Sequence, residues 1–180
     1  GNLIGLNGSG TAAIPNAYAG VAINAANNNL IGTSAGGVNQ FISGNTREGI
    51  WVASSSGTFI GQTNSIGVAS DGVTPLGNGL EGVMLTSASN TSVFAAIVAY
   101  NGGAGVAVVG DSSVNNQVSI RRNYANGGLP VDLGNDGPTA NGSHGTTGPN
   151  NWINYPVITA WNSTTIWGTA CAGCTIYLYQ

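Results

Sequence analysis

The stretch Gly82-Val83-Met84-Leu85 decides the fold, because its pattern of a glycine, a β-branched residue, any residue and an aliphatic residue returns along the chain. The other copies are Gly20-Val21-Ala22-Ile23, Gly49-Ile50-Trp51-Val52, Gly105-Val106-Ala107-Val108 and the degenerate Pro130-Val131-Asp132-Leu133. The copies start at residues 20, 49, 82, 105 and 130, and their shortest spacing, 23 residues, is near one coil of a three-stranded β-helix. The longer spacings indicate loops inserted at a turn.

Two further motifs follow the first strand in a constant order, as a three-stranded coil requires. The second strands read Asn29-Leu30-Ile31-Gly32, Thr58-Phe59-Ile60-Gly61, Thr91-Ser92-Val93-Phe94 and Asn116-Gln117-Val118. The third strands read Asn2-Leu3-Ile4-Gly5, Phe41-Ile42-Ser43-Gly44-Asn45, Asn64-Ser65-Ile66-Gly67, Ala96-Ile97-Val98-Ala99-Tyr100-Asn101 and Val118-Ser119-Ile120-Arg121-Arg122-Asn123. We expect the asparagine that ends a third strand, as in Asn45, Asn101 and Asn123, to adopt a left-handed turn and to stack on the asparagine of the next coil.

These motifs predict an all-β chain, a right-handed parallel β-helix of about five short coils of three strands, with a C-terminal β extension. Alternate side chains of a strand point inward, so Val83 and Leu85 should join aliphatic ladders that run from coil to coil. The expected organisation is a parallel β-helix at 1–134, a Gly/Asn/Thr loop at 135–150 and a C-terminal β segment at 151–180. The alternative is a β-sandwich, which does not require three motifs in a constant order.

Charge is scarce in this chain. Charged residues make up 5% of it, the net charge is −3, and the cations are Arg47, Arg121 and Arg122. Binding of nucleic acid depends on phosphate neutralisation, so we expect none. No run of 18 apolar residues is present, so we expect no membrane insertion. Asn-Gly pairs and low charge are typical of extracellular repeat proteins, which predicts an extracellular or cell-surface piece of a longer secreted protein.

Several segments resemble a known group of proteins. Residues 2–11, Asn2-Leu3-Ile4-Gly5-Leu6-Asn7-Gly8-Ser9-Gly10-Thr11, are similar to the Gly-Asn-x-Ile-Gly-Thr repeat of bacterial cell-surface proteins in the pectate-lyase-like right-handed parallel β-helix superfamily. Residues 39–45, 127–137, 147–150 and 154–158 resemble further segments of the same proteins. The resemblance implies the fold and an extracellular setting, and it implies no particular activity.

The end of the chain resembles the opening strands of an Ig-like module, which often follows such repeats. We expect residues 151–180 to be either a cap on the β-helix or an incomplete module of this kind. Cys171 and Cys174 form a Cys-x-x-Cys pair, for which we expect a local disulfide in an oxidising compartment. Two cysteines alone do not make a closed zinc site.

Acidic residues offer two candidate sites. Glu48 and Glu81 each precede a first-strand glycine, so they should lie on adjacent coils as a weak candidate for a catalytic carboxylate pair. The alternative is a pair of solvated turn residues, with Glu48 paired to Arg47. Asp132, Asn135 and Asp136 supply oxygen atoms that could bind Ca²⁺, although Asp and Asn also serve simply to cap turns. No other metal or cofactor is expected.

The outward positions of the first strands suggest a binding surface. Trp51 and Met84 should be adjacent and exposed, and aromatic faces stack on sugar rings while apolar patches bind proteins. The alternative is that a loop, or the tail with Trp152, Trp161 and Trp167, covers this patch.

Two functions remain open. The first is a non-catalytic extracellular structural or adhesive protein, such as a surface stalk, an adhesin segment or a self-assembling filament subunit. Its expected partners are copies of itself or other surface proteins, because the open ends of a β-helix invite stacking. The second is a β-helix that binds or cleaves polysaccharide through Trp51 and the Glu48 and Glu81 edge. The low charge favours the first function over an enzyme.

Overall fold

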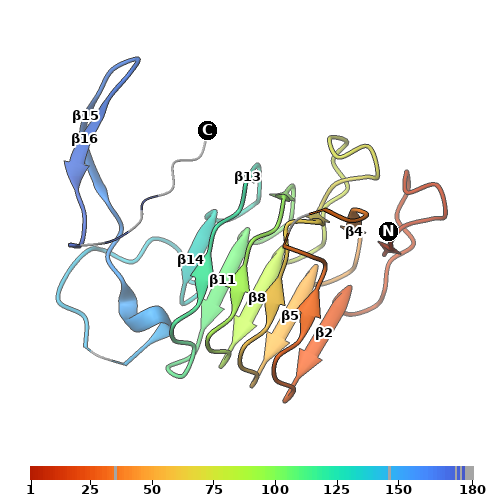
Figure 1. Cartoon of the computed structure of the whole chain (residues 1–180), viewed down its shortest axis with the longest axis horizontal. Coiled ribbons are helices and arrows are strands. Elements are labelled where there is room, and N and C mark those ends of the chain that lie inside the picture. Colours follow the sequence, from red (N-terminus) through yellow and green to blue (C-terminus); the bar gives the residue numbers. More distant parts are fainter. Residues whose placement is uncertain (35, 146, 173, 175, 177–180) are drawn as a thin grey trace.

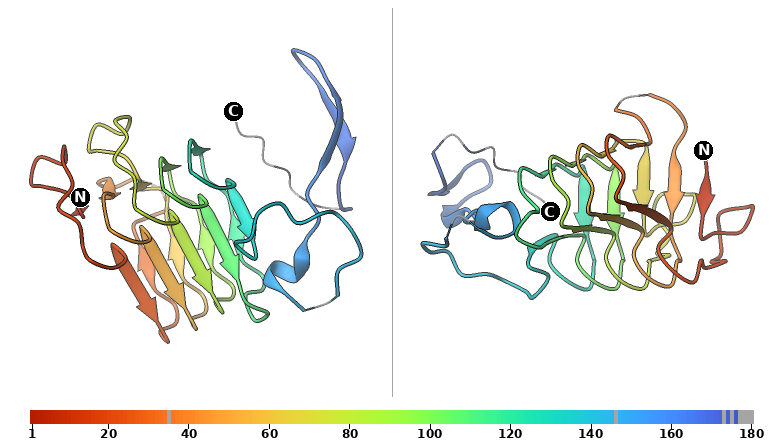
Figure 2. Two further views of the ribbon diagram at one scale, coloured as in Figure 1. Left: turned by 180° about the vertical axis from the view of Figure 1, so that it is seen from behind. Right: turned by 90° about the horizontal axis from the view of Figure 1, so that it is seen from below.

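The computed structural model describes residues 1–34, 36–145, 147–172, 174 and 176. Its strands form a parallel β-solenoid of about four turns, with successive coils side by side along one axis (Figure 1). The described residues contain no α-helix, and so no helix of the length and apolar character that crossing a membrane requires. Views from behind and from below show the same stack of coils, with the C-terminal segment at one end (Figure 2).

Three parallel sheets form the walls of the solenoid. The first-strand sheet contains β2 (Val21–Asn24), β5 (Ile50–Ala53), β8 (Val83–Thr86), β11 (Val106–Val109) and β14 (Val131–Leu133). The second-strand sheet contains β3 (Leu30–Ile31), β6 (Phe59–Ile60), β9 (Ser92–Val93) and β12 (Gln117–Val118). The third-strand sheet contains β1 (Leu3–Ile4), β4 (Gln40–Ile42), β7 (Asn64–Ile66), β10 (Ile97–Ala99) and β13 (Arg122–Tyr124). The prediction of a parallel β-helix with three strands per coil is confirmed.

Four coils contain all three strands, while β1 and β14 each add a single strand at one end. The first strands pair in the register that the repeated motif predicts, since Ile50 lies opposite Val83 and Val83 lies opposite Val106. The repeat therefore fixes which residues face inward, because a slip of one residue would turn every aliphatic side chain to the outside.

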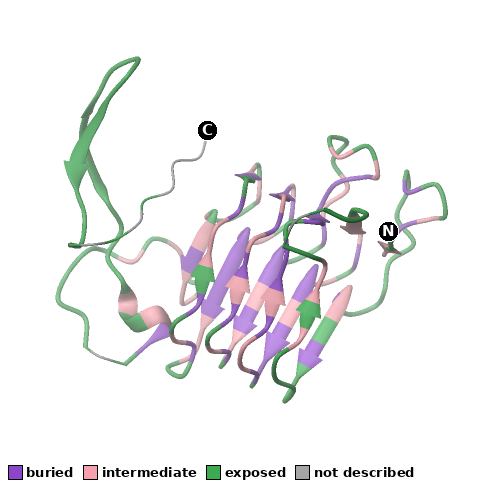
Figure 3. Ribbon diagram, in the orientation of Figure 1, coloured by how far each residue is buried: buried purple, intermediate pink, exposed green. Residues whose placement is uncertain are grey.

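Inward side chains form a continuous aliphatic core. The inward first-strand residues of the middle coils are fully buried, among them Val52, Leu85 and Val108, which are consecutive along the axis. Toward both ends the inward residues become partly exposed, as Val21 and Leu133 are. Figure 3 shows this gradient, with buried residues concentrated in the middle strands. Each coil therefore obtains its burial from its two neighbours.

A ladder of asparagines runs along the corner that follows the third strands. The side-chain amide of Asn45 donates to Oδ1 of Asn78 (2.8 Å), Asn78 donates to Asn101 (2.9 Å), and Asn101 donates to Asn126 (3.0 Å). The backbone N–H of each donor residue bonds to the same oxygen (3.1–3.2 Å). Asn16 precedes the series and donates to Asn45 (2.8 Å). These bonds satisfy buried polar groups that the coil itself leaves without partners.

The long loops between the third and the next first strand return an asparagine to this ladder. The loop at 6–19 supplies Asn16, and the loop at 68–81 supplies Asn78. A loop can therefore be long on the outside without interrupting the stack, because its last residues re-enter the corner at the same position.

The last third strand differs from the prediction. Asn123 pairs in register with Val98, so it lies inside β13 and not at the turn after it. Asn126 takes the ladder position, and its amide donates to Asn123 Oδ1 (2.9 Å). Asn123 in turn donates to the carbonyl oxygen of Pro130 (2.7 Å), which closes the ladder at this end.

The expectation of left-handed asparagines is also wrong. The positive φ belongs to the residue before the ladder position, namely Gly44 (69°), Tyr100 (60°) and Ala125 (51°). The chain thus turns one residue earlier, and the asparagine backbone stays free to bond the next coil.

The segment after β14 lies beyond the last complete coil. It contains a short 3₁₀ turn, η1 (Pro149–Trp152), and an antiparallel hairpin of β15 (Val157–Trp161) and β16 (Ile166–Thr169). The hairpin is exposed along its whole length (Figure 3). By contrast, η1 contacts β11 and β14, and Asn150 bonds to the coils.

The ladder predicts a large cost for removing one asparagine. We expect Asn78→Ala to lower the free energy of unfolding by about 2–4 kcal/mol, because each buried polar group left without a partner costs about 1–3 kcal/mol. Urea denaturation followed by circular dichroism measures this difference. The exposed Asn24 on β2 provides the control, and Asn24→Ala should change the stability by less than about 0.5 kcal/mol. Equal effects of the two substitutions would contradict a structural ladder.

The burial gradient predicts that the same truncation costs more in the middle of the stack than at its end. Leu85→Ala should lower the free energy of unfolding by about 2–5 kcal/mol, since coils on both sides enclose the cavity. Leu133→Ala should cost less than half as much, because Leu133 is already partly exposed. The two melting curves, measured on otherwise identical chains, decide whether the coils share their core in this way.

Candidate functional site

The two candidate catalytic carboxylates lie on adjacent coils, as the repeat predicts. The backbone N–H of Gly49 donates to the carbonyl oxygen of Glu81, which places Glu48 and Glu81 in the same position of successive coils. Neither side chain is open to a substrate, since Glu48 is 3% and Glu81 is 6% exposed. A general acid or base must reach the reacting group, and in this structure both carboxylates are packed against the chain itself.

Each buried carboxylate has a partner from its own chain. Glu48 Oε1 accepts a charged hydrogen bond from Arg47 Nη2 (3.1 Å), and Glu81 Oε1 accepts one from the side-chain amide of Asn135 (3.0 Å). Glu48 Oε2 is buried and has no hydrogen-bond partner among the described residues. Neither glutamate is a solvated turn residue, and the pairing of Glu48 with Arg47 is present.

The three candidate calcium ligands have different surroundings in the structure. Asp132 is buried beneath the segment 134–137, where its Oδ2 accepts from the N–H of Gly137 (3.1 Å). Asn135 reaches back over the outer face of the first-strand sheet to Glu81, and Asp136 is exposed. In the part of the chain that the structure describes, no three His, Cys, Asp or Glu side chains gather as a metal site.

Trp51 and Met84 lie opposite each other on adjacent strands, and both are partly buried. The ring of Tyr18, from the loop at 6–19, meets the Trp51 ring edge-on at 5.7 Å between centroids. The guanidinium of Arg47 in turn lies over the Tyr18 ring, 4.4 Å from its centroid. Trp51 Nε1 donates to the hydroxyl of Thr86 (3.3 Å). A loop therefore covers part of the patch.

The stack of Arg47, Tyr18 and Trp51 was not predicted, although the sequence holds a signal for it. Tyr18 and Arg47 each lie two residues before a first-strand glycine, Gly20 and Gly49, and so occupy the same position on adjacent coils. The tail does not cover this patch, since Trp161 and Trp167 remain 75% and 49% exposed. The segment 134–137 instead covers the outward-facing Asp132 on β14, which is in register with Ala107 and Met84.

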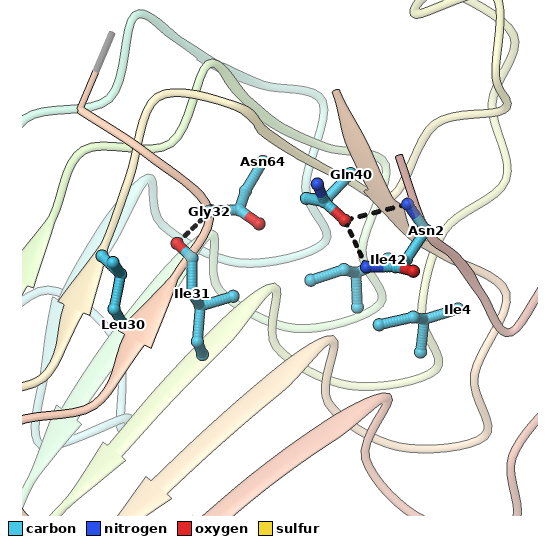
Figure 4. Close-up of a pocket in the computed structure, with 8 residues that line it drawn as sticks. All are labelled: Asn2, Ile4, Leu30, Ile31, Gly32, Gln40, Ile42 and Asn64. Carbon is cyan, nitrogen blue, oxygen red and sulfur yellow. Dashed lines mark hydrogen bonds between the residues drawn. The ribbon is translucent and has the colours of Figure 1, made fainter. Parts of the chain in front are cut away.

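A pocket of about 240 Å³ opens at the N-terminal end of the solenoid, between β1 and β3. Figure 4 shows its lining residues, Asn2, Ile4, Leu30, Ile31, Gly32, Gln40, Ile42 and Asn64. The isoleucines form an apolar floor, and both the backbone and the side-chain amide of Asn2 donate to Gln40 Oε1 (2.9 and 2.8 Å) at the rim. No motif in the sequence indicated this pocket, because the strands that enclose it are far apart along the chain.

One amide of the pocket is incompletely bonded. The Asn64 side-chain N–H group donates to the carbonyl oxygens of Ile31 and Gly61, both at 2.8 Å. Its Oδ1 is buried and finds no donor among the described residues, and Figure 4 shows this oxygen turned into the space between Ile31 and Gln40. The pocket therefore has both polar and apolar lining residues, and the buried Asn64 Oδ1 has no donor among the described residues.

Two titratable groups, Asp71 and Tyr124, have pKa values that depart from their ordinary ones. Hydrogen bonds from the hydroxyl and backbone of Thr74 and from the backbone of Val73 lower the pKa of Asp71 in an exposed loop. Burial and the neighbouring Tyr100 raise the pKa of Tyr124 above its ordinary value of 10.0. The Asp71 hydrogen bonds hold a turn, and the Tyr124 ring packs edge-on against the Tyr100 ring, with 5.4 Å between the centroids.

Cys171 and Cys174 are joined by a disulfide across a turn, with their Cα atoms 5.5 Å apart. His144 lies in the exposed loop before η1, where its Nε2 contacts the carbonyl oxygen of Ala140 (2.8 Å).

No family model, curated protein or solved structure matches the chain. Its function must therefore be argued from its own geometry.

The aromatic stack predicts that Tyr18 protects Trp51. Tyr18→Ala should destabilise the chain by about 0.5–1.5 kcal/mol, the usual worth of an aromatic pair, and should increase the quenching of Trp51 fluorescence by acrylamide. The measurement uses a background in which Trp152, Trp161 and Trp167 are replaced by phenylalanine. Tyr155→Ala, in the exposed C-terminal segment, is the matched control and should leave the quenching unchanged. Unchanged quenching in the Tyr18 variant would show that the loop does not cover Trp51.

Proposed function

We propose that this chain is a non-catalytic extracellular structural or adhesive module, of the kind found in the surface-repeat proteins of the pectate-lyase-like superfamily that its motifs resemble. The observation that carries the proposal is the unbroken asparagine ladder, which ties every complete coil to the next one. Such a ladder holds successive coils in one register along the axis, which suits a spacer or a stalk.

The burial and hydrogen bonding of two acidic side chains support the same function. Glu48 and Glu81 are the best-placed carboxylate pair, and the chain uses both as buried hydrogen-bond acceptors for Arg47 and Asn135. The disulfide between Cys171 and Cys174 agrees with an oxidising, extracellular location. The proposed partners are copies of the chain or other surface proteins.

Polysaccharide binding is the second candidate, and one observation favours it. Trp51, Tyr18 and Met84 form a partly exposed apolar strip on the outer face of the first-strand sheet. Aromatic side chains of this kind stack on the apolar faces of sugar rings. The strip suits adhesion to a glycan without requiring cleavage of it.

Turnover assays separate the structural from the enzymatic function. We expect no new reducing ends and no unsaturated products from a panel of neutral and acidic polysaccharides, because the two glutamates cannot contact a substrate. Both carboxylates accept buried hydrogen bonds, so Glu48→Gln and Glu81→Gln should lower the melting temperature. The two variants should give the same result as the wild type in the polysaccharide assays. Product formation by the wild-type chain that disappears in these variants would overturn the structural function.

A further inference from the structure

Asparagine is followed directly by glycine at residues 7–8, 78–79, 101–102, 126–127 and 141–142. This dipeptide is especially prone to lose ammonia, because glycine carries no Cβ to hinder its own backbone nitrogen. That nitrogen attacks the asparagine Cγ, so a new C–N bond forms, the bond from Cγ to Nδ2 breaks, and ammonia leaves with the proton of the attacking N–H group. Water then opens the cyclic imide at either carbonyl carbon and gives aspartate or isoaspartate.

In the asparagine ladder the fold blocks this reaction. The attacking nitrogens of Gly79, Gly102 and Gly127 each donate to a carbonyl oxygen of the preceding coil (2.8–2.9 Å). The side-chain amides of the asparagines before them each donate two hydrogen bonds as well (2.9–3.2 Å). Both reacting groups are therefore held, and an attack requires the coils to open first.

The glycines of the ladder have a packing reason that Gly8 lacks. A Cβ on Gly79, Gly102 or Gly127 would lie 2.1–2.3 Å from a backbone carbonyl oxygen of the coil before it, so only glycine fits there. A Cβ on Gly8 would meet no atom within 4 Å, and the Gly8 backbone is not in the left-handed region. The reactive dipeptides of the ladder follow from packing, whereas the fold does not require the one at 7–8.

The pair at 141–142 is also held by hydrogen bonds. The N–H of Gly142 donates to Asn154 Oδ1 (3.1 Å), and the Asn141 side chain exchanges two hydrogen bonds with the backbone of Tyr155 (2.8 and 2.9 Å). All of these residues are exposed, so their bonds open more readily than those of the ladder. This pair is therefore protected, but less firmly than the ladder pairs.

The attacking and leaving groups at residues 7–8 are free of such bonds. Gly8 is exposed in the turn of the loop at 6–19, and its N–H makes no hydrogen bond among the described residues. The side-chain nitrogen of Asn7, which must leave, likewise donates to no acceptor in the part of the chain that the structure describes. No bond between coils has to break before Gly8 attacks.

The carbonyl oxygen of the same amide is held by three donors. Asn7 Oδ1 accepts from the backbone N–H groups of Thr11 (2.9 Å) and Ala12 (3.2 Å), and from the hydroxyl of Ser9 (3.1 Å). When the Gly8 nitrogen adds to Cγ, negative charge develops on this oxygen, and donors that are already in place stabilise it. The turn thus supplies its own asparagine with what an oxyanion hole supplies to a substrate.

The loop at 68–81 shows that a turn of this kind accommodates a carboxylate. Like the loop at 6–19, it is closed by an isolated antiparallel bridge. Its two backbone N–H groups at the corresponding place, those of Val73 and Thr74, donate to Asp71 Oδ1 (2.9 and 2.8 Å). An aspartate at position 7 has the same two kinds of donor within reach, so the folded loop accepts this product.

We propose that Asn7 is a modification site, at which the folded chain slowly converts itself to aspartate and isoaspartate while the other Asn-Gly pairs are protected. The conversion adds one negative charge to the net charge of −3. Isoaspartate also lengthens the backbone before Gly8, and so loosens the loop that carries Asn16 and Tyr18. The modification goes beyond the structural function proposed above and does not depend on it.

Peptide mapping by mass spectrometry, during incubation of the full chain at neutral pH, measures the conversion of each pair. In the folded chain Asn7 should react at least about tenfold faster than Asn78, Asn101 or Asn126, because it alone combines a free nitrogen with donors to the oxyanion. Asn141 should react at an intermediate rate. In urea all of these pairs should react at similar rates, because unfolding exposes the same dipeptide everywhere.

Substitutions around Asn7 test the mechanism. Gly8→Ala fits the open space at this position, and its methyl group hinders the attacking nitrogen, so the conversion should slow at least about tenfold with an unchanged circular dichroism spectrum. Ser9→Ala removes one donor to Oδ1 and should slow the conversion by a smaller factor. Val73→Ala, an exposed position in the corresponding loop, is the matched control and should leave the rate at Asn7 unchanged.

Three results would overturn the modification site. They are a folded chain in which Asn7 reacts no faster than the ladder asparagines, one in which Asn141 reacts faster than Asn7, or a Gly8→Ala variant that converts at the rate of the wild type. None of these results bears on the structural function, which the polysaccharide turnover assays test. The two proposals can therefore be rejected separately.

Discussion

A single coil of this protein is too thin to bury its own side chains, and most of the structure follows from that constraint. A coil is one strand thick along the axis, so each inward residue depends on the coils above and below it for its burial. Leu85 is fully buried because Val52 and Val108 lie on its two sides, whereas Leu133 has a coil on one side only and stays partly exposed. Burial here is a property of neighbours, which explains why the stability should fall toward the ends.

The asparagine ladder solves the polar part of the same problem. At each corner the backbone leaves the sheet and would carry buried groups without partners, and an amide side chain can bond to both the backbone and the next amide. Asn45, Asn78 and Asn101 do this with the same geometry, although loops of different length lead to them. The ladder also has a direction, because each amide donates to the next coil. That direction makes the two ends of the solenoid chemically different.

The two candidate catalytic glutamates are buried and hydrogen-bonded to other parts of the chain. Glu48 and Glu81 occupy one position of the repeat, and Tyr18 and Arg47 occupy another. Any two residues at the same distance from a first-strand glycine lie beside each other on adjacent coils. A repeat therefore brings like residues together whether or not they share a function. In this chain the contacts that form at those positions, between Arg47 and Tyr18 and between Glu81 and Asn135, attach loops to the outer surface.

The amino-acid pattern alone was enough to predict the solenoid, its three strands per coil and the inward residues, since a period of two within strands and a recurring glycine leave one register that buries the aliphatic side chains. It also indicated that asparagines would stack, but it misplaced the last rung at Asn123 and the left-handed residue of the turn, because both depend on where the chain leaves the sheet. The burial of Glu48, Glu81 and Asp132, the cover of Tyr18 over Trp51 and the pocket between β1 and β3 became visible in the folded chain alone. These features join segments that are 26 or more residues apart or that fold back over a sheet, and no local pattern records which outer face a loop will cover.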